Sequence, residues 1–162
     1  MPDSFYCILP SPVGDLLLVA KGAALSDLHI INGKYVPAIG ADWRQDAQHP
    51  VLQQAAQELG QYFAGQRKVF SLPLAPQGTA FQQTAWQALL QIPFGKTISY
   101  GQQAKNMGKP QAVRAVGGAN GKNPIAIIIP CHRVLGANGA LTGYSGGMDH
   151  KMFLLRHEGV LL

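Results

Sequence analysis

The chain has 162 residues, of which 47% are hydrophobic and 13% are charged, about half of the roughly 25% usual for soluble domains. This composition excludes a disordered or acidic solvating protein, and no apolar run reaches the roughly 20 residues of a membrane span. Two cysteines, Cys7 and Cys131, are too few for a disulfide framework, and CxxC zinc spacing is absent. No secretory signal is visible, so we expect a reduced, cytoplasmic protein with no membrane partner.

Basic residues are concentrated in the second half of the chain. Residues 1–78 carry five bases and six acids, a net charge of −1, whereas residues 79–162 carry eight bases and two acids, a net charge of +6. No acidic residue lies between Glu58 and Asp149. Such a stretch indicates a polyanion partner, although a basic surface kept for solubility accounts for the charge equally well.

The first half of the sequence predicts a small sheet and a helix. Pro50 begins an amphipathic stripe that ends at Gly65, which predicts the helix. Proline and glycine then become frequent, which predicts a domain boundary near residue 78. Short apolar segments between turn-forming residues predict strands at residues 5–9, 16–20, 25–31 and 69–74.

Two helices of the second half have clear start signals. Thr79 and Gln82 have the spacing of a capping box, which predicts a helix start, and Gly95 lies after the expected end. Asp149 is placed to cap a last helix that continues through His157.

Residues 97–119 predict two short helices joined by a tight turn. The first helix spans 100–107, Gly108 breaks it, and Pro110 suits the first turn of the second helix, which is the helix-turn-helix pattern. The second helix holds small side chains around Arg114. Small residues favour close approach to a narrow DNA groove, and the alternative explanation is close helix packing in the core.

A candidate nucleophile follows the most apolar segment of the chain. Residues 125–129 predict a fully buried strand that ends at Pro130, directly before Cys131 and His132. A lone cysteine at a strand end is often an inert core residue. Here His132 and a carboxylate at Glu158 supply a possible base and orienting group. Because successive extended side chains point apart, we expect a water molecule between the thiol and the imidazole.

Two further motifs flank this segment. Residues 143–147 surround Tyr144 with glycines, which favours a lid over a planar ligand, and a surface loop with a packed tyrosine is the alternative. Gly121-Lys122 resembles the end of a phosphate-binding loop, but Val116 and Asn123 break that motif at both ends. We therefore reject a nucleotide-binding loop.

Residues 130–134, Pro-Cys-His-Arg-Val, resemble the O6-alkylguanine-DNA alkyltransferases, the methylated-DNA–protein-cysteine methyltransferases, together with Asn123-Pro124 and residues 143–147. The specific resemblance covers residues 79–162. It implies an α/β (α+β) fold, with a ribonuclease H-like sheet-plus-helix domain at 1–78. The domain at 79–162 is then mostly helical, binds DNA and carries out catalysis, with a helix-turn-helix and a short active-site strand.

The resemblance also implies a single-turnover repair reaction without a cofactor. An alkyl group on O6 of guanine in double-stranded DNA would pass irreversibly to Cys131, and O4-alkylthymine is left open as a second substrate. His132 would act through water as the base, and Glu158 would orient it. Asn123 would support the active-site strand and order the thiol. Tyr144 would line the guanine pocket and help protonate the departing O6 oxygen.

DNA contacts follow from the same resemblance. Tyr100 would press on the 3′ phosphate, and Arg114 would fill the place of the extruded base. A monomer is expected, with cooperative assembly on DNA left open. Further contacts to the base are expected from Ser145, Gly146, Val134 and Ala126. Further contacts to DNA are expected from Ala112, Ala115, Gly117, Lys109 and Lys122.

Some members of the family hold zinc in the N-terminal domain through Cys and His ligands. Cys7, His29 and His49 are the candidates in this half of the chain, and we expect no metal there.

Two other function classes compete with this interpretation. One is a binding protein that recognises alkylated DNA without reacting, and intact Cys131, His132 and Glu158 argue against it. The other is a cysteine-dependent hydrolase unrelated to DNA, which leaves the acid-free basic stretch and Arg114 unexplained.

Overall fold

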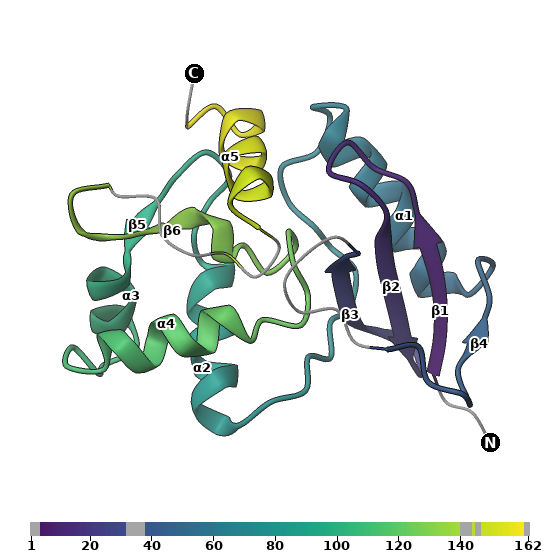
Figure 1. Cartoon of the computed structure of the whole chain (residues 1–162), viewed down its shortest axis with the longest axis horizontal. Helices are drawn as coiled ribbons and strands as arrows, with labels where there is room; N and C mark the ends of the chain where they lie inside the picture. Colours follow the sequence, from purple (N-terminus) through teal and green to yellow (C-terminus); the bar gives the residue numbers. More distant parts are fainter. Residues whose placement is uncertain (1–3, 32–37, 140–143, 145–146, 161–162) are drawn as a thin grey trace.

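The N-terminal half is a four-stranded sheet with one helix against it (Figure 1). The computed structural model describes residues 4–31, 38–139, 144 and 147–160. The sheet has the order β3-β2-β1-β4, antiparallel except for the parallel pair of β1 and β4. Its elements are β1 (Ser4–Leu9), β2 (Leu16–Lys21), β3 (Ala24–Ile30), β4 (Arg44–Gln45) and α1 (Pro50–Phe63).

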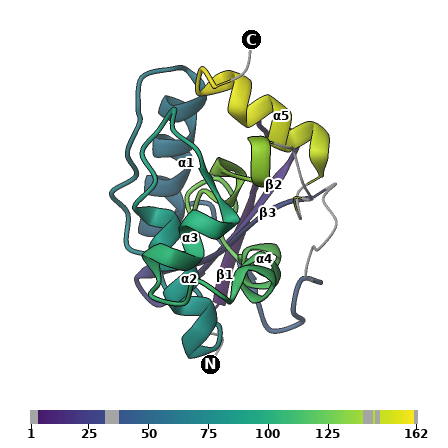
Figure 2. The ribbon, with the colours of Figure 1, turned by 90° about the vertical axis from the view of Figure 1, so that its left-hand side faces the viewer.

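The C-terminal half is mostly helical and lies beside the sheet (Figures 1 and 2). The short strands β5 and β6 pair in parallel. Figure 2 shows α2, α3 and α4 toward the viewer, with the sheet behind them. The elements are α2 (Ala80–Leu90), β5 (Ile98–Ser99), α3 (Tyr100–Asn106), α4 (Val113–Gly121), η1 (Cys131–Arg133), β6 (Val134–Leu135), η2 (Ala137–Gly139) and α5 (Met148–His157).

A continuous hydrophobic core joins the two halves. Strand β2 is buried from Leu16 to Ala20 because it lies inside the sheet. Leu52 and Leu59 of α1 pack into the same core as Trp86 of α2 and the apolar segment 125–129. The active-site segment is therefore supported from both halves. Among the described residues, no helix has both the length and the apolar character needed to cross a bilayer.

Local start signals are confirmed at several helices. Pro50 occupies the first turn of α1, and Thr79 and Gln82 form both hydrogen bonds of the capping box. Two starts differ from expectation. Helix α4 begins at Val113, because Pro110 and Gln111 form a turn instead of its first residues. Helix α5 begins one residue before Asp149, so this side chain lies in the first turn and is not the cap.

The predicted strand at residues 125–129 is wrong. Ile125 makes only an isolated bridge to Leu28, after which the chain forms a compact buried turn. The N–H of Ile129 donates to the carbonyl of Ile125 at 3.0 Å, and Ile127 has φ +72°. A β-branched residue in this left-handed region costs about 1–2 kcal/mol. Burial of the apolar side chains and hydrogen bonds to Asn123 offset that cost.

Residues 69–74 also fail to form the expected strand. Leu74 makes a single bridge to Leu25, and the remaining residues form an irregular segment between the two halves. The mixed α+β organisation expected from the sequence is confirmed, with a turn in place of the active-site strand.

Candidate active site

Asn123 fixes the buried turn and contacts the thiol at its end. Its Nδ2 donates to the carbonyl of Ile129 at 2.7 Å and to Sγ of Cys131 at 3.2 Å. Its Oδ1 accepts from the N–H of Ile125 at 3.0 Å. These bonds replace the ladder that a strand would have made. One amide therefore sets both the path of the turn and the position of Sγ.

His132 is an oriented proton acceptor next to Cys131. Its side chain is 0% exposed, and Nε2 lies 2.6 Å from Oε2 of Glu158. A carboxylate at this distance requires the proton on Nε2, so the lone pair of a neutral ring lies on Nδ1. Nδ1 is buried and has no hydrogen-bond partner in the part of the chain that the structure describes. The ring is thus arranged to take a proton at Nδ1 while Glu158 stabilises the charge.

Several donors converge on the carboxylate of Glu158. Oε2 accepts from Tyr62 Oη at 2.6 Å and from Nη2 of Arg133 at 3.1 Å, in addition to His132. Oε1 accepts from Nε of Arg133 at 2.7 Å and from the N–H of Gly95 at 3.3 Å. Burial alone would raise the pKa of Glu158, but the contacts with His132 and Arg133 hold it well below its usual range. Glu158 is therefore ionised at neutral pH.

Burial shifts the pKa values of the thiol and the imidazole in opposite directions. It raises the pKa of Cys131, and the Asn123 hydrogen bond and the charge of Lys151 offset part of that rise. It lowers the pKa of His132, with a partial offset from Glu158. At neutral pH the protonated thiol therefore lies near a neutral base, which is the starting state of general base catalysis.

Lys151 is a buried cation of this centre that the sequence did not indicate. Its side chain is 0% exposed, and Nζ donates to the carbonyl of Val134 at 2.8 Å. Burial lowers the pKa of Lys151, and the proximity of Cys131 raises it. A lysine on a terminal helix is normally solvated, so only the fold shows that it points inward.

Arg133 and Tyr62 were also missed as members of the site. Arg133 is one of the eight basic residues of 79–162, yet it is only 6% exposed and donates to the carbonyl of Ile92 at 2.6 Å as well as to Glu158. Its position in the Pro-Cys-His-Arg motif was the available signal. Tyr62 belongs to the apolar stripe of α1, where nothing local distinguishes it from a core residue.

Tyr144 is a buried phenol in the electrostatic environment of Cys131. Its side chain is buried, and its hydroxyl has no hydrogen-bond partner among the described residues. Burial, followed by electrostatic interactions with Cys131, Tyr62 and Glu158, raises the pKa of Tyr144 well above its ordinary value. The phenol therefore keeps its proton at neutral pH. Ala126 and Val134 are likewise buried, whereas Ser145 and Gly146 lie outside the described residues.

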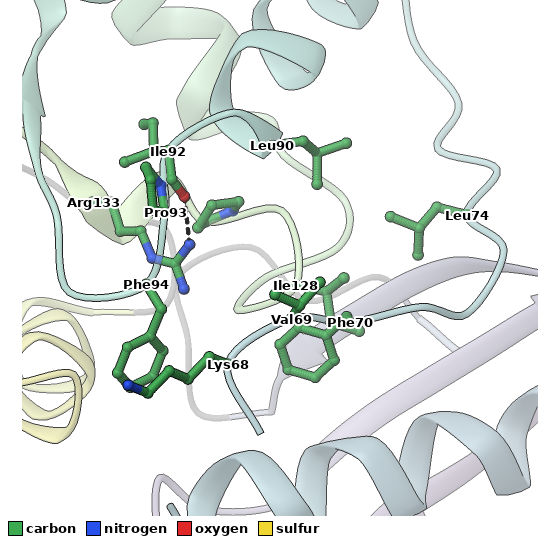
Figure 3. A pocket seen from close by; sticks show the side chains of 11 residues that line it. Lys68, Val69, Phe70, Leu74, Leu90, Ile92, Pro93, Phe94, Ile128 and Arg133 are labelled. Atoms are coloured by element: carbon green, nitrogen blue, oxygen red, sulfur yellow. Dashed lines mark hydrogen bonds between the residues drawn. The ribbon is translucent and has the colours of Figure 1, made fainter. Parts of the chain in front are cut away.

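A cavity of about 330 Å³ lies behind the active-site turn (Figure 3). Its walls come from residues 68–70, 74, 90 and 92–94, and Ile128, Pro130 and Arg133 lie on the side of the turn. Figure 3 shows Arg133 bonded to the carbonyl of Ile92 at its edge. Neither Cys131 nor Tyr144 lines this cavity, so the cavity is separate from the thiol.

Helix α4 is anchored by one face and exposed on the other. Trp86 Nε1 of α2 donates to the carbonyl of Ala119 at 2.9 Å, and the side chain of Val116 lies on the buried face of α4. The exposed residues of α4 and its C-cap are Val113, Arg114, Ala115, Gly118 and Lys122. The small residues Ala115 and Gly118 therefore lie between two cations on the exposed surface of the helix-turn-helix.

The other predicted DNA contacts surround this surface. Tyr100 begins α3 and is half-buried, with its ring against Gly117, where an added Cβ would lie 3.8 Å from the ring. Ala112 is half-buried at the N-cap of α4, and Lys109 is exposed in the turn before it.

Among the described residues, no group of three or more His, Cys, Asp or Glu side chains is placed to hold a metal ion. The absence of zinc stays a prediction.

Comparisons with known proteins agree across the whole chain. Residues 4–76 match the ribonuclease-like domain of 6-O-methylguanine DNA methyltransferase, and residues 80–160 match its DNA binding domain. The methylated-DNA–protein-cysteine methyltransferase of Methanosarcina acetivorans is 48% identical over 155 residues, covering 96% of this chain and 98% of that protein. The Haemophilus influenzae protein of the same name is 45% identical over 161 residues, covering 99% and 89%.

Solved structures give the same result. The Mycobacterium tuberculosis OGT in complex with DNA superposes with a TM-score of 0.87 at 44% identity, covering 97% of this chain and 94% of that chain. The fold, the buried cysteine and these comparisons together identify the class as DNA alkyltransferases. The chain belongs to the 6-O-methylguanine DNA methyltransferase family, whose members repair DNA by transferring an alkyl group to a cysteine. The family resemblance seen in the sequence is confirmed.

Proposed function

We propose that this protein reverses O6-alkylation of guanine in double-stranded DNA by accepting the alkyl group on Cys131. The observation that carries the proposal is the buried thiol, held by Asn123 near a neutral His132 that is bound to an ionised Glu158. The names of the relatives and the DNA complex of the M. tuberculosis protein support it. The cytoplasmic location predicted from the sequence is part of the same proposal.

The reaction is a displacement at the alkyl carbon. The thiol proton passes through water to Nδ1 of His132, and Glu158 stabilises the resulting imidazolium through Nε2–H. Sulfur attacks the carbon, the C–O6 bond breaks, and its electron pair stays on the guanine oxygen. Tyr144 donates a proton to that oxygen and regains one from His132. The products are guanine and a thioether that water does not cleave readily, so each molecule reacts once.

Access to O6 requires that the nucleotide leave the base stack, which costs a few kcal/mol. We propose that α4 lies in the minor groove, where Ala115 and Gly118 allow close approach and Arg114 fills the space of the extruded base. Tyr100 then contacts the adjacent phosphate, and Lys109 and Lys122 contribute salt-sensitive affinity. Ala112 and Gly117 lie along the same groove.

The extruded guanine is proposed to bind beside Cys131. Tyr144, Val134 and Ala126, all buried, are the proposed lining of its pocket. Ser145 and Gly146, which the family resemblance adds to the contacts with the base, lie outside the described residues.

Intact mass after incubation with an O6-methylguanine duplex tests the proposal. We expect a single addition of one methylene that stops at one equivalent, is absent in Cys131→Ser and persists in Cys7→Ser. Cys7 is the matched control because it is also a buried, free cysteine but lies on β1. DNA binding without a mass change would contradict transfer and indicate a recognition protein. Repeated product release without a mass change would indicate a hydrolase.

A further inference from the structure

The N-terminal sheet domain supplies a donor to the catalytic carboxylate. Tyr62 of α1 and Glu158, at the end of α5, are 96 residues apart in sequence, yet Oη of Tyr62 donates to Oε2 at 2.6 Å. The same oxygen accepts from Nε2 of His132, also at 2.6 Å. Both side chains of this contact are buried, so water does not compete for the carboxylate.

The tyrosine ring is held independently of Glu158. It packs against Phe63, Phe70 and Phe94 at centroid distances of 5.1, 5.5 and 6.0 Å. The ring of His157 lies 4.8 Å away, and its Nε2 is 2.6 Å from the carbonyl oxygen of Tyr62. The position of the hydroxyl is therefore set by aromatic packing between α1, the segment around Phe94 and α5.

The phenol is a permanent donor in this environment. Burial and the negative charge of Glu158 raise the pKa of Tyr62 far above its ordinary value, so it keeps its proton throughout the usable pH range. A carboxylate that accepts a strong hydrogen bond presents less negative charge to its other partners. The bond from Tyr62 consequently reduces the stabilisation that Oε2 gives to a protonated His132.

Other charged and titratable groups around His132 act in both directions. The cations of Arg133 and Lys151 oppose its protonation, and the carboxylate of Glu158 favours it. Cys131 and Tyr144 are near and stay protonated at rest because burial raises the pKa of each. Tyr62 differs from all of them because it acts on His132 only through Glu158.

We propose that Tyr62 is a positioning residue that holds Oε2 of Glu158 in line with His132 and weakens the attraction of that oxygen for the imidazole proton. The N-terminal domain thereby sets the proton affinity of the catalytic base. The catalytic consequence rests on the proposed function, whereas the effect on His132 does not. The base stays neutral at neutral pH, ready to accept the thiol proton.

Titration of the His132 imidazole by NMR tests this without any substrate. The signal is assigned by its loss in His132→Gln. In Tyr62→Phe, which keeps the ring and removes the donor, we expect the pKa of His132 to rise by about one unit. The acid limb of the rate with free O6-benzylguanine should move to higher pH by the same amount. Fluorotyrosine at position 62, a stronger donor, should move both in the opposite direction.

Tyr6→Phe is the matched control, because it also removes a phenol hydroxyl but lies on β1 against Trp43. We expect it to leave the pKa of His132 unchanged. An unchanged His132 pKa in folded Tyr62→Phe would overturn the proposal, even if the rate fell at every pH. An equal shift in Tyr6→Phe would also overturn it. If the wild type transferred no alkyl group, the proposed function would fail while the titration would still decide the role of Tyr62.

Discussion

Gln103 of α3 and Asn120 of α4 exchange hydrogen bonds of 3.0 and 2.8 Å inside the helix-turn-helix. Both side chains are buried, and Nε2 of Gln103 also donates to the carbonyl of Ala85 in α2 at 3.2 Å. A buried amide pair of this kind tolerates no rotation of either helix without leaving polar groups unpaired. The pair therefore fixes which face of α4 points outward, and that face carries Arg114.

Replacement of Arg114 by alanine should affect duplex DNA and not the free base. In the proposed complex Arg114 fills the space of the extruded nucleotide and offsets a flipping cost of a few kcal/mol, so we expect Arg114→Ala to slow duplex repair by about 10- to 100-fold. The reaction with free O6-benzylguanine should be unchanged. Single-turnover rates on both substrates measure this, with Arg44→Ala on the exposed strand β4 as the control. Equal losses on both substrates would contradict the role.

A substitution at Gly118 tests whether α4 lies close to DNA in the minor groove, without disturbing the free protein. An added Cβ meets nothing within 4 Å, so Gly118→Leu should fold normally and gain up to about 1 kcal/mol of helix stability. On DNA the leucine would occupy the groove, and we expect affinity to fall by at least about tenfold, or about 1.4 kcal/mol. Gly60→Leu on α1, equally open, is the matched control. Unchanged affinity in Gly118→Leu would place DNA elsewhere.

Loss of the Asn123 amide should destabilise the turn and deactivate the thiol together. Asn123→Ala leaves the carbonyl of Ile129 and the N–H of Ile125 without this partner, at about 1–3 kcal/mol for each buried group. The pKa of Cys131 should rise because a donor to sulfur is gone. Urea unfolding and the pH dependence of iodoacetamide alkylation measure the two effects. Asn106→Ala at the exposed end of α3 should change neither.

Removal of the buried charge at Lys151 should move the thiol titration to higher pH. Lys151→Met keeps the length of the side chain, and loss of the cation should raise the pKa of Cys131. Above the new midpoint the variant should react as fast as the wild type or faster, since nucleophilicity increases with thiol pKa. Iodoacetamide rates against pH test this, with exposed Lys96→Met as the control. A lower rate at every pH, with an unmoved midpoint, would indicate a purely structural role.

Acid should destabilise the protein in two stages. The pKa values of His132 and Glu158 lie below their ordinary values in the folded state, so the unfolded chain binds protons first as pH falls. Stability from His132 is present above about pH 6.5 and is lost below it, and stability from Glu158 is lost from about pH 4.3 downward. Each group contributes at most about 1.4 kcal/mol per pH unit.

Urea unfolding at successive pH values measures this dependence. His132→Gln should lack the first stage and keep the second. Parallel curves for the two proteins would contradict the assignment.

Local chemistry explains which parts of the fold were predictable. The capping box of Thr79 and Gln82 and the Pro50 start are decided within a few residues, and both are confirmed. Residues 125–129 were misassigned because a short apolar run has the same composition in a buried strand and a buried turn. The deciding contacts come from the Asn123 side chain, which sequence periodicity does not report.

The site was predictable from its motif, the flanks of the motif and one carboxylate. These pointed to Cys131, His132, Asn123 and Glu158, which the structure brings together in one buried centre. In the sequence pattern of their helices, Lys151 fits the place of a solvated lysine and Tyr62 fits the place of a core residue. Their contacts with Val134 and Glu158 form only when the helices pack against the active-site segment, so no local sequence pattern predicts them.

The span of the Tyr62–Glu158 contact has a consequence for refolding. Contacts between residues far apart in sequence form late, because the entropy of closing the intervening loop must be overcome first. Helices α1 and α2, whose start signals are local, can form early without creating this centre. A refolding chain should therefore regain its helical circular dichroism before the reactivity of Cys131. The thiol should reach its native reactivity only in the step that brings Tyr62 and Glu158 together.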